Sequence, residues 1–199
     1  YNILELGVFM FTIVKMYMTL MPLILAGIAN MVFCKSTILS WCNHPIDGGK
    51  ILADGRPLFG ANKTWRGFLG MIVFTSFFQL IWFSLLATST LHFYPKDYTI
   101  WVHAGIGALL GLTYVSCELP NSFLKRRLAI APGKEAQHSW AWFFIWIDQI
   151  DSLLGCVAIL ALFTPMTPPL YLFYILLGGL THLIINRCLY ILKLRKNRY

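Results

Sequence analysis

The run Phe143-Phe144-Ile145-Trp146-Ile147-Asp148-Gln149-Ile150-Asp151-Ser152-Leu153-Leu154-Gly155 is apolar along most of its length, yet it carries two carboxylates at its centre. It belongs to a longer stretch, residues 140–163, that contains no further charged residue. A helix that crosses a membrane needs about 20 mostly apolar residues, so this stretch predicts a membrane-spanning helix. Acidic residues inside such a helix are expensive and usually functional. The same stretch therefore indicates both the fold class and the place to look for a site.

The composition extends this interpretation to the whole chain. Apolar residues make up 58% of the 199 residues and charged residues make up 12%, against roughly 45–50% and about 25% in soluble domains. The mean hydropathy is +0.67. So few charges cannot cover a soluble surface, which argues against a soluble enzyme, a disordered chain or a coiled coil. We expect an all-α integral membrane protein that forms a single domain over residues 1–199.

Hydropathy predicts about five transmembrane helices, over residues 4–33, 68–93, 100–119, 140–163 and 170–192. Lys and Arg are concentrated in the loops 34–67 and 120–139 and in the C-terminal tail, whereas the other two loops contain only Lys96. Basic residues accumulate on the cytoplasmic side of membrane proteins. We therefore expect a multi-pass protein of the cell membrane with its N-terminus outside and its C-terminus inside. Both long loops, and a polar cavity between the spans, would then face the cytoplasm.

The two acids of the fourth span are three residues apart, which places both carboxylates on one face of a helix. Each would cost about 2.5–3.5 kcal/mol at the centre of a span, and the two repel each other unless a cation lies between them. A divalent metal is the natural partner, and oxygen ligands favour Mg²⁺. A proton relay is a competing use. Structural ion pairing is another. A different placement is also open, in which residues 140–146 form an interfacial aromatic belt and the span covers about residues 147–163, with the acids at its cytoplasmic mouth facing the basic loops.

The segment from residue 54 to residue 67 is dense in glycines and cations. Lys63 and Arg66 supply cationic donors, and Thr64 is the expected N-cap of the second span. Basic side chains and a hydroxyl group at a helix N-terminus are typical of phosphate binding. A basic turn that holds lipid headgroups is the alternative. The pattern is not that of a P-loop, so a nucleotide hydrolase is not supported.

The third span ends in a second cluster of charges. Glu118 lies at its expected cytoplasmic end, just before Pro120, which we expect to break the helix. Lys125, Arg126 and Arg127 follow. A basic membrane anchor with one stray acid is the simplest alternative. If these groups instead face the acids of the fourth span, one cavity would hold three acids among several cations, which is typical of phosphoryl or nucleotidyl transfer.

Taken in order, these motifs resemble a known family. Ser122-Phe123-Leu124-Lys125-Arg126 followed by Asp148-Gln149-Ile150-Asp151 is similar to the phosphatidate cytidylyltransferase signature, in which Ser-x-x-Lys-Arg leads to Asp-Arg-x-Asp. With Lys63-Thr64-Trp65-Arg66-Gly67 and Asn121 added, the chain more closely resembles the five-span CDP-archaeol synthase family. The resemblance covers residues 45–155, and the outer spans agree by hydropathy. The segments 129–134 and 137–140 depart from the Lys-Asp and His-Gly-Gly of the first signature.

The resemblance implies a CTP:lipid-phosphate cytidylyltransferase, which would transfer CMP from CTP to a membrane lipid phosphate for phospholipid biosynthesis. The products would be CDP-archaeol, or a similar CDP-lipid, and pyrophosphate. It implies that Mg²⁺ is bound by Glu118, Asp148 and Asp151 and that these acids act with Lys63 and Lys125 in catalysis. CTP and phosphate contacts would come from Lys63, Thr64, Arg66, Asn121, Ser122, Lys125 and Arg126. The partners would be CTP, the lipid phosphate and the bilayer, and no nucleic acid, despite a net charge of +8.

Several alternatives stay open at this point. The lipid could be phosphatidate, which would give CDP-diacylglycerol, because apolar walls accept either kind of chain. A small ion- or proton-coupled carrier would also use paired intramembrane acids, and a membrane anchor or assembly factor would need no site. The histidines, including His182, carry little weight as catalytic groups. The number of metal ions and the oligomeric state are not readable, and a homodimer is one option.

Overall fold

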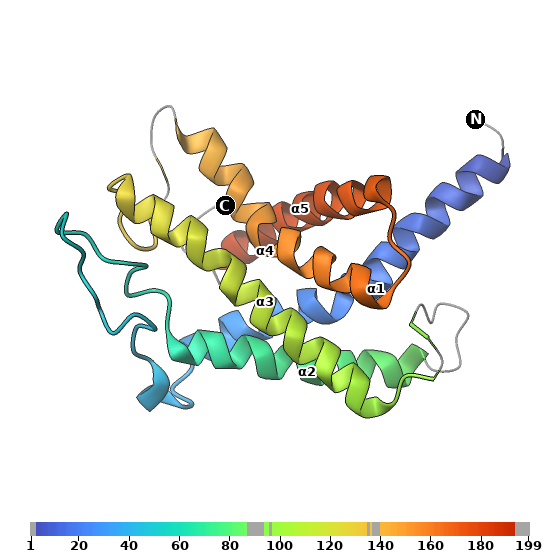
Figure 1. Cartoon of the computed structure of the whole chain (residues 1–199), viewed down its shortest axis with the longest axis horizontal. Coiled ribbons are helices and arrows are strands. Elements are labelled where there is room, and N and C mark those ends of the chain that lie inside the picture. Colours follow the sequence, from blue (N-terminus) through green and yellow to red (C-terminus); the bar gives the residue numbers. More distant parts are fainter. Residues whose placement is uncertain (1–2, 87–93, 96, 135, 137–139, 194–199) are drawn as a thin grey trace.

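The computed structural model describes residues 3–86, 94–95, 97–134, 136 and 140–193. Within these residues the chain forms five long helices and one short 3-10 helix, arranged as Figure 1 shows. The long helices are α1 (Ile3–Lys35), α2 (Trp65–Leu86), α3 (Ile100–Arg127), α4 (Ala141–Phe163) and α5 (Pro168–Ile191), and η1 is Ser40–Cys42. Each long helix is long and apolar enough to cross a membrane. The described residues form no extended strands, only two isolated bridges, so the all-α membrane class is confirmed.

The helices agree with the predicted spans except at their ends. Residues 87–93 of the predicted second span lie outside the described residues, as do residues 135 and 137–139 of the second loop and residues 194–199 of the basic tail. One expectation was wrong, because Pro120 does not break the third span: α3 continues through it to Arg127.

Tertiary contacts explain why the helix continues. A proline inside a helix costs about 3 kcal/mol, but neighbouring helices can satisfy the backbone groups that it frees in a membrane protein. The last two turns of α3 carry Ser122 and Arg126, both buried, and Asn121, which forms hydrogen bonds with α4. These residues therefore lie on a helix rather than in the loop 120–139 that we expected.

Successive helices pack against each other in chain order. The approach of α2 and α3 is especially close. A Cβ atom on Gly107 would lie 2.6 Å from the Cα of Ser76, and one on Gly111 would lie 2.7 Å from the Cα of Ile72. Small residues four apart allow helix backbones to approach in this way in membranes. The pair thus forms a rigid support for the C-terminal half of α3.

The connection between α1 and α2 docks onto the end of α3, at the left of Figure 1. The guanidinium of Arg127 donates hydrogen bonds to both carboxylate oxygens of Asp54 at 2.7 Å and a further one to the carbonyl of Pro57. Arg56 donates in return to the backbone carbonyl of Arg127. The two basic segments therefore lie at the same end of the helix bundle.

The side chain of Asp47 organises the same connection from within. Its carboxylate accepts hydrogen bonds from the backbone N–H groups of Gly49 and Phe59, both at 2.9 Å, and of Gly60 at 3.4 Å. Burial alone would raise the pKa of Asp47, but these hydrogen bonds to the charged form outweigh it and lower the pKa below its usual value. The carboxylate thus stabilises the turn that leads to Lys63.

Candidate active site

A cavity of about 470 Å³ lies between α1, α3, α4 and α5 and reaches the first loop at Lys63. One part of its wall is apolar and comes from α1 and α5, with Leu20, Leu23, Ile24, Ile28, Ile185 and Leu189. The other part is polar. It contains most of the site residues that the sequence predicted, namely Lys63, Glu118, Asn121, Ser122, Lys125, Arg126, Asp148 and Asp151. The cavity thus joins a charged cluster to a surface suited to hydrocarbon.

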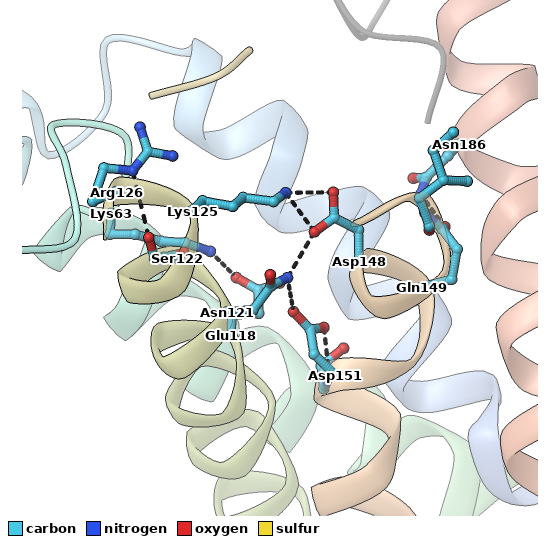
Figure 2. A network of polar contacts seen from close by, with 12 residues as sticks. Lys63, Glu118, Asn121, Ser122, Lys125, Arg126, Asp148, Gln149, Asp151 and Asn186 are labelled. Atoms are coloured by element: carbon cyan, nitrogen blue, oxygen red, sulfur yellow. Dashed lines mark hydrogen bonds and ion pairs between the residues drawn. The ribbon is translucent and has the colours of Figure 1, made fainter. Parts of the chain in front are cut away.

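The two acids of α4 lie on one helix face, as their spacing predicted, and one amide of α3 bridges them. The Nδ2 of Asn121 donates hydrogen bonds to Asp148 Oδ1 at 2.6 Å and to Asp151 Oδ2 at 2.7 Å, as Figure 2 shows. Asp148 also forms an ion pair with Lys125. Asp151 is buried and accepts a further hydrogen bond from the backbone N–H of Ser152 at 2.6 Å. Donors from α3 therefore hold both carboxylates in the cavity.

The partners on α3 follow the period of a helix. Glu118, Asn121, Ser122 and Lys125 are spaced i, i+3, i+4 and i+7, so all four lie on one side of the helix. This arrangement depends on the helix continuing through Pro120. Glu118 forms an ion pair with Lys63 of the first loop, so a third acid and a second lysine complete the cluster (Figure 2).

Arg126 and Asn121 both present buried polar atoms that the described residues leave unsatisfied. The side chain of Arg126 is only 4% exposed, and its Nε donates to the carbonyl of Ser122 at 3.4 Å. Its Nη1 has no hydrogen-bond partner in the described part of the chain, and the same holds for the carbonyl Oδ1 of Asn121. A buried donor or acceptor without a partner is costly. Both atoms are therefore suited to a ligand that enters the cavity.

Thr64 lies beside the main cavity, and it caps α2 as predicted. Its Oγ1 accepts a hydrogen bond from the backbone N–H of Gly67 at 3.3 Å, which is the N-cap geometry. Thr64 lines a smaller cavity of about 230 Å³ between α1, α2 and α3. That cavity shares Lys63 and Glu118 with the main one.

Arg66 is not brought into either cavity, contrary to the expectation that it contacts phosphate. Its side chain is buried, and it donates to the carbonyl of Ser36 at 3.0 Å and to that of Cys34. These carbonyls belong to the C-terminal end of α1, where unpaired carbonyls and the helix dipole favour a cation. Arg66 therefore joins the end of α1 to the start of α2.

Sequence reasoning missed several residues that line the main cavity: Tyr17, Tyr114, Lys134, His182 and Asn186. In α5, His182, Ile185, Asn186 and Leu189 follow the i, i+3, i+4, i+7 pattern of one helix face. Two polar residues on one face of an apolar span are the signal that could have identified them. The motifs of the family resemblance do not extend to α5, which agreed with the family by hydropathy alone.

The chemistry of the site fits Mg²⁺, although the side chains do not converge as a ready-made metal site. In the described residues, no three His, Cys, Asp or Glu side chains are placed to hold a metal ion together. Mg²⁺ in nucleotide sites, however, usually takes one or two carboxylates and completes its shell with water and substrate phosphates. Asp148 and Asp151 supply two adjacent carboxylates, and Asn121 Oδ1 is a further oxygen without a partner.

Comparisons with known proteins identify the family to which this chain is similar. The family model described as CarS-like, CDP-archaeol synthase, matches residues 9–199. The CDP-archaeol synthase of Hyperthermus butylicus is 37% identical over 126 residues, which is 63% of this chain and 62% of that protein. Thus the match spans less than two thirds of this relative. The CDP-archaeol synthases of Thermofilum pendens and Methanoculleus marisnigri are 30% and 33% identical, over 88% and 71% of this chain and 76% and 81% of theirs.

A solved structure also resembles this fold. It is described as an intramembrane enzyme for archaeal membrane lipids biosynthesis, and it superposes with a TM-score of 0.59 at 25% identity. The similarity covers 85% of this chain and 91% of that one. The overall arrangement of helices is therefore shared with a solved intramembrane enzyme.

Proposed function

Since this chain belongs to the CDP-archaeol synthase family, we propose that it transfers CMP from CTP to a membrane lipid phosphate, giving a CDP-lipid and pyrophosphate. The observation that carries the proposal is the cavity with two kinds of wall. A lipid phosphate has a charged head and hydrocarbon chains, and this cavity offers both chemistries side by side. A carrier would not need the hydrocarbon wall next to the cluster of lysines and acids.

The reaction is an in-line exchange at the α-phosphorus of CTP. An oxygen of the lipid phosphate forms a bond to that phosphorus, the bond to the oxygen that bridges to the β-phosphorus breaks, and pyrophosphate leaves. A lipid phosphate is already anionic at neutral pH, so no side chain has to remove a proton from it. The protein's contribution is alignment of two anions and neutralisation of their charge.

The cations of the cavity are placed for that task. Lys63 and Lys125 each already bind a carboxylate oxygen, and phosphate oxygens can replace these partners. Arg126 has its unsatisfied Nη1 in the same cavity, and a guanidinium binds phosphate well. Ser122 and the capped N-terminus of α2 at Thr64 offer further donors. We assign these groups to the phosphates of CTP and of the lipid together.

The acids have a different role. Asp148 and Asp151 would hold Mg²⁺, with Glu118 as a third oxygen donor close by, and Asn121 keeps the first two in place. When it is bound, Mg²⁺ supplies positive charge at the transferred phosphate and at the leaving pyrophosphate. Without the metal, Glu118 and Asp148 keep Lys63 and Lys125 oriented in the cavity.

The orientation in the membrane follows from the same assignment. CTP is made and used in the cytoplasm, so we place the polar end of the cavity, with the first loop and the end of α3, on that side. The N-terminus would then lie outside and the C-terminus inside, as the distribution of Lys and Arg favours. Among lipids we favour unsaturated archaeol phosphate, because the named relatives are CDP-archaeol synthases.

Pyrophosphate release tests the proposal. Purified protein in detergent micelles is given CTP with Mg²⁺, with and without a lipid phosphate. We expect pyrophosphate only when the lipid phosphate is present, in amounts equal to the CDP-lipid formed. Release without any lipid would indicate a nucleotide hydrolase, and no release with either archaeol phosphate or phosphatidate would contradict the proposal.

A further inference from the structure

The first of the two residues between the acids of α4 is held by the neighbouring helix. Gln149 follows Asp148 directly, but its side chain points away from α3 and is only 1% exposed. Its Oε1 accepts a hydrogen bond from Nδ2 of Asn186 in α5 at 2.8 Å (Figure 2). Its Nε2 donates to the carbonyl of Ile145 in its own helix at 3.2 Å. Asn186 is itself buried, so this amide pair lies away from solvent.

α5 holds the same residue of α4 through the backbone as well. Nδ1 of His182 lies 3.3 Å from the backbone carbonyl oxygen of Gln149. A carbonyl oxygen only accepts hydrogen bonds, so His182 carries its proton on Nδ1. Gly179 allows the two helices to approach, because a Cβ atom there would lie 2.8 Å from Cγ2 of Ile150. Three residues of α5 thus fix one turn of α4.

Helix geometry links this contact to the direction in which the acids point. Successive residues of an α-helix are separated by about 100° around its axis, since a turn takes 3.6 residues. When Gln149 faces α5, Asp148 and Asp151 face α3, where Asn121 binds both. A rotation of α4 that moved the acids would separate the Gln149–Asn186 pair and leave buried amide groups without partners, which is unfavourable.

We propose that Asn186, supported by His182, is a positioning residue that sets the rotation of α4 through Gln149. It thereby holds the carboxylates of Asp148 and Asp151 toward Asn121, without binding substrate itself. The inference rests on the proposed cytidylyltransfer, because it assigns Asn186 a role in the rate of that reaction. A displacement of catalytic groups by about 1 Å can lower a rate about 100-fold, so loss of this contact should affect catalysis more than binding.

The test compares Asn186→Leu with a reciprocal exchange in the full chain. We expect Asn186→Leu to lower kcat for CDP-lipid formation about 10- to 100-fold, with the KM for the lipid phosphate changed less than twofold. The double variant Gln149→Asn with Asn186→Gln restores an amide pair of the same total length. It should recover most of the lost kcat. Gln149→Asn alone should be as impaired as Asn186→Leu.

Tyr174→Phe is the matched control. Tyr174 lies in the same helix, is buried, and accepts a hydrogen bond from Thr19 of α1 at 3.3 Å, but it does not line the cavity. We expect this variant to keep the kcat of the unmodified protein. If Asn186→Leu fails to elute as a folded monodisperse species, Asn186→Ala, which adds no volume, replaces it.

The outcomes separate the two proposals. An unmodified protein that makes no CDP-lipid contradicts the proposed function. An active protein whose Asn186→Leu variant keeps its kcat overturns the positioning role. A raised KM for the lipid with no recovery in the reciprocal exchange overturns it too, because Asn186 would then contact the lipid directly.

Discussion

At the residue scale, the site depends on individual cations and acids whose surroundings differ sharply. Lys63 and Arg66 are three residues apart and carry the same charge, yet one enters the cavity and the other joins α1 to α2. The sequence predicted both as phosphate ligands. The sequence alone could not tell Lys63 from Arg66, because their different surroundings depend on where the C-terminal end of α1 lies in space.

Removal of one acid should abolish turnover. Asp148→Asn keeps the shape of the side chain but removes the charge that binds Lys125 and that would hold Mg²⁺. We expect a loss of about 10²- to 10³-fold in kcat, as for other preorganised electrostatic groups, in a protein that still elutes as folded. Asp97→Asn, at the opposite end of α3, is the control and should be fully active. An active Asp148→Asn variant would falsify the site assignment.

Lys63→Ala and Arg66→Ala should behave differently. Lys63→Ala removes a phosphate ligand, so we expect a large loss of kcat/KM for CTP with little change in Tm. Arg66→Ala leaves the carbonyls of Cys34 and Ser36 without this partner, at about 1–3 kcal/mol, so it should lower Tm while the remaining folded protein keeps its KM for CTP. Steady-state kinetics and thermal unfolding of the two variants test this contrast. An equal rise in the KM for CTP in both variants would show that Arg66 also contributes to CTP binding.

At the element scale, hydropathy predicted the existence and type of all five spans, because a membrane helix is a local property of about 20 residues. The ends were less predictable. Pro120 argued for a helix end, and the contacts of Asn121, Ser122 and Arg126 with the rest of the bundle outweighed that preference. The inward face of α5, with His182 and Asn186, was also missed, because a helix face points into a cavity only through tertiary packing.

The close packing of α2 and α3 leads to a prediction at this scale. Gly111→Ala would place a Cβ atom 2.7 Å from the backbone of Ile72, so it should reduce the free energy of unfolding by about 1–3 kcal/mol. Gly105 lies in the same helix, and in the described part of the chain no atom beyond the local helix backbone lies within 4 Å of a Cβ built there. Gly105→Ala should therefore be neutral or slightly stabilising. Thermal unfolding of both variants in one detergent gives the comparison.

The first loop should depend on pH through Asp47. Its pKa is lowered in the folded protein, so its contribution to stability is complete above the ordinary value of about 3.9 and is lost as the pH falls through the folded pKa. We expect hydrogen exchange in residues 47–60 to accelerate as the pH falls below about 4, beyond the intrinsic dependence of exchange on pH. Asp47→Asn should show faster exchange at neutral pH and no such additional acceleration.

At the scale of the whole molecule, the helices enclose a cavity in which charged groups meet an apolar wall. α3 and α4 supply the acids, α3 and the first loop supply most of the cations, and α1 and α5 supply most of the apolar surface. The sequence predicted the polar half through its motifs. It could not predict the apolar half as a lipid site, because every membrane span has an apolar surface.

Removal of divalent cations should stop the reaction. With excess EDTA, we expect CDP-lipid formation to fall below detection and to return when Mg²⁺ is added in excess of the chelator. Ca²⁺ in place of Mg²⁺ controls for charge alone. The two ions carry the same charge, but Ca²⁺ prefers longer bonds and more ligands. Full turnover in EDTA would show that the reaction needs no divalent cation. The lysines and Arg126 would then be the whole source of the charge that neutralises the phosphates.

We expect, above all, that this cavity binds CTP and a membrane lipid phosphate together and joins them. The most direct measurement is mass spectrometry of the lipids after purified protein has been incubated with CTP, Mg²⁺ and equal amounts of unsaturated archaeol phosphate and phosphatidate. We predict a CDP-lipid, chiefly CDP-archaeol, that is absent with the Asp148→Asn variant. A folded protein that leaves both lipids unchanged would contradict the claim.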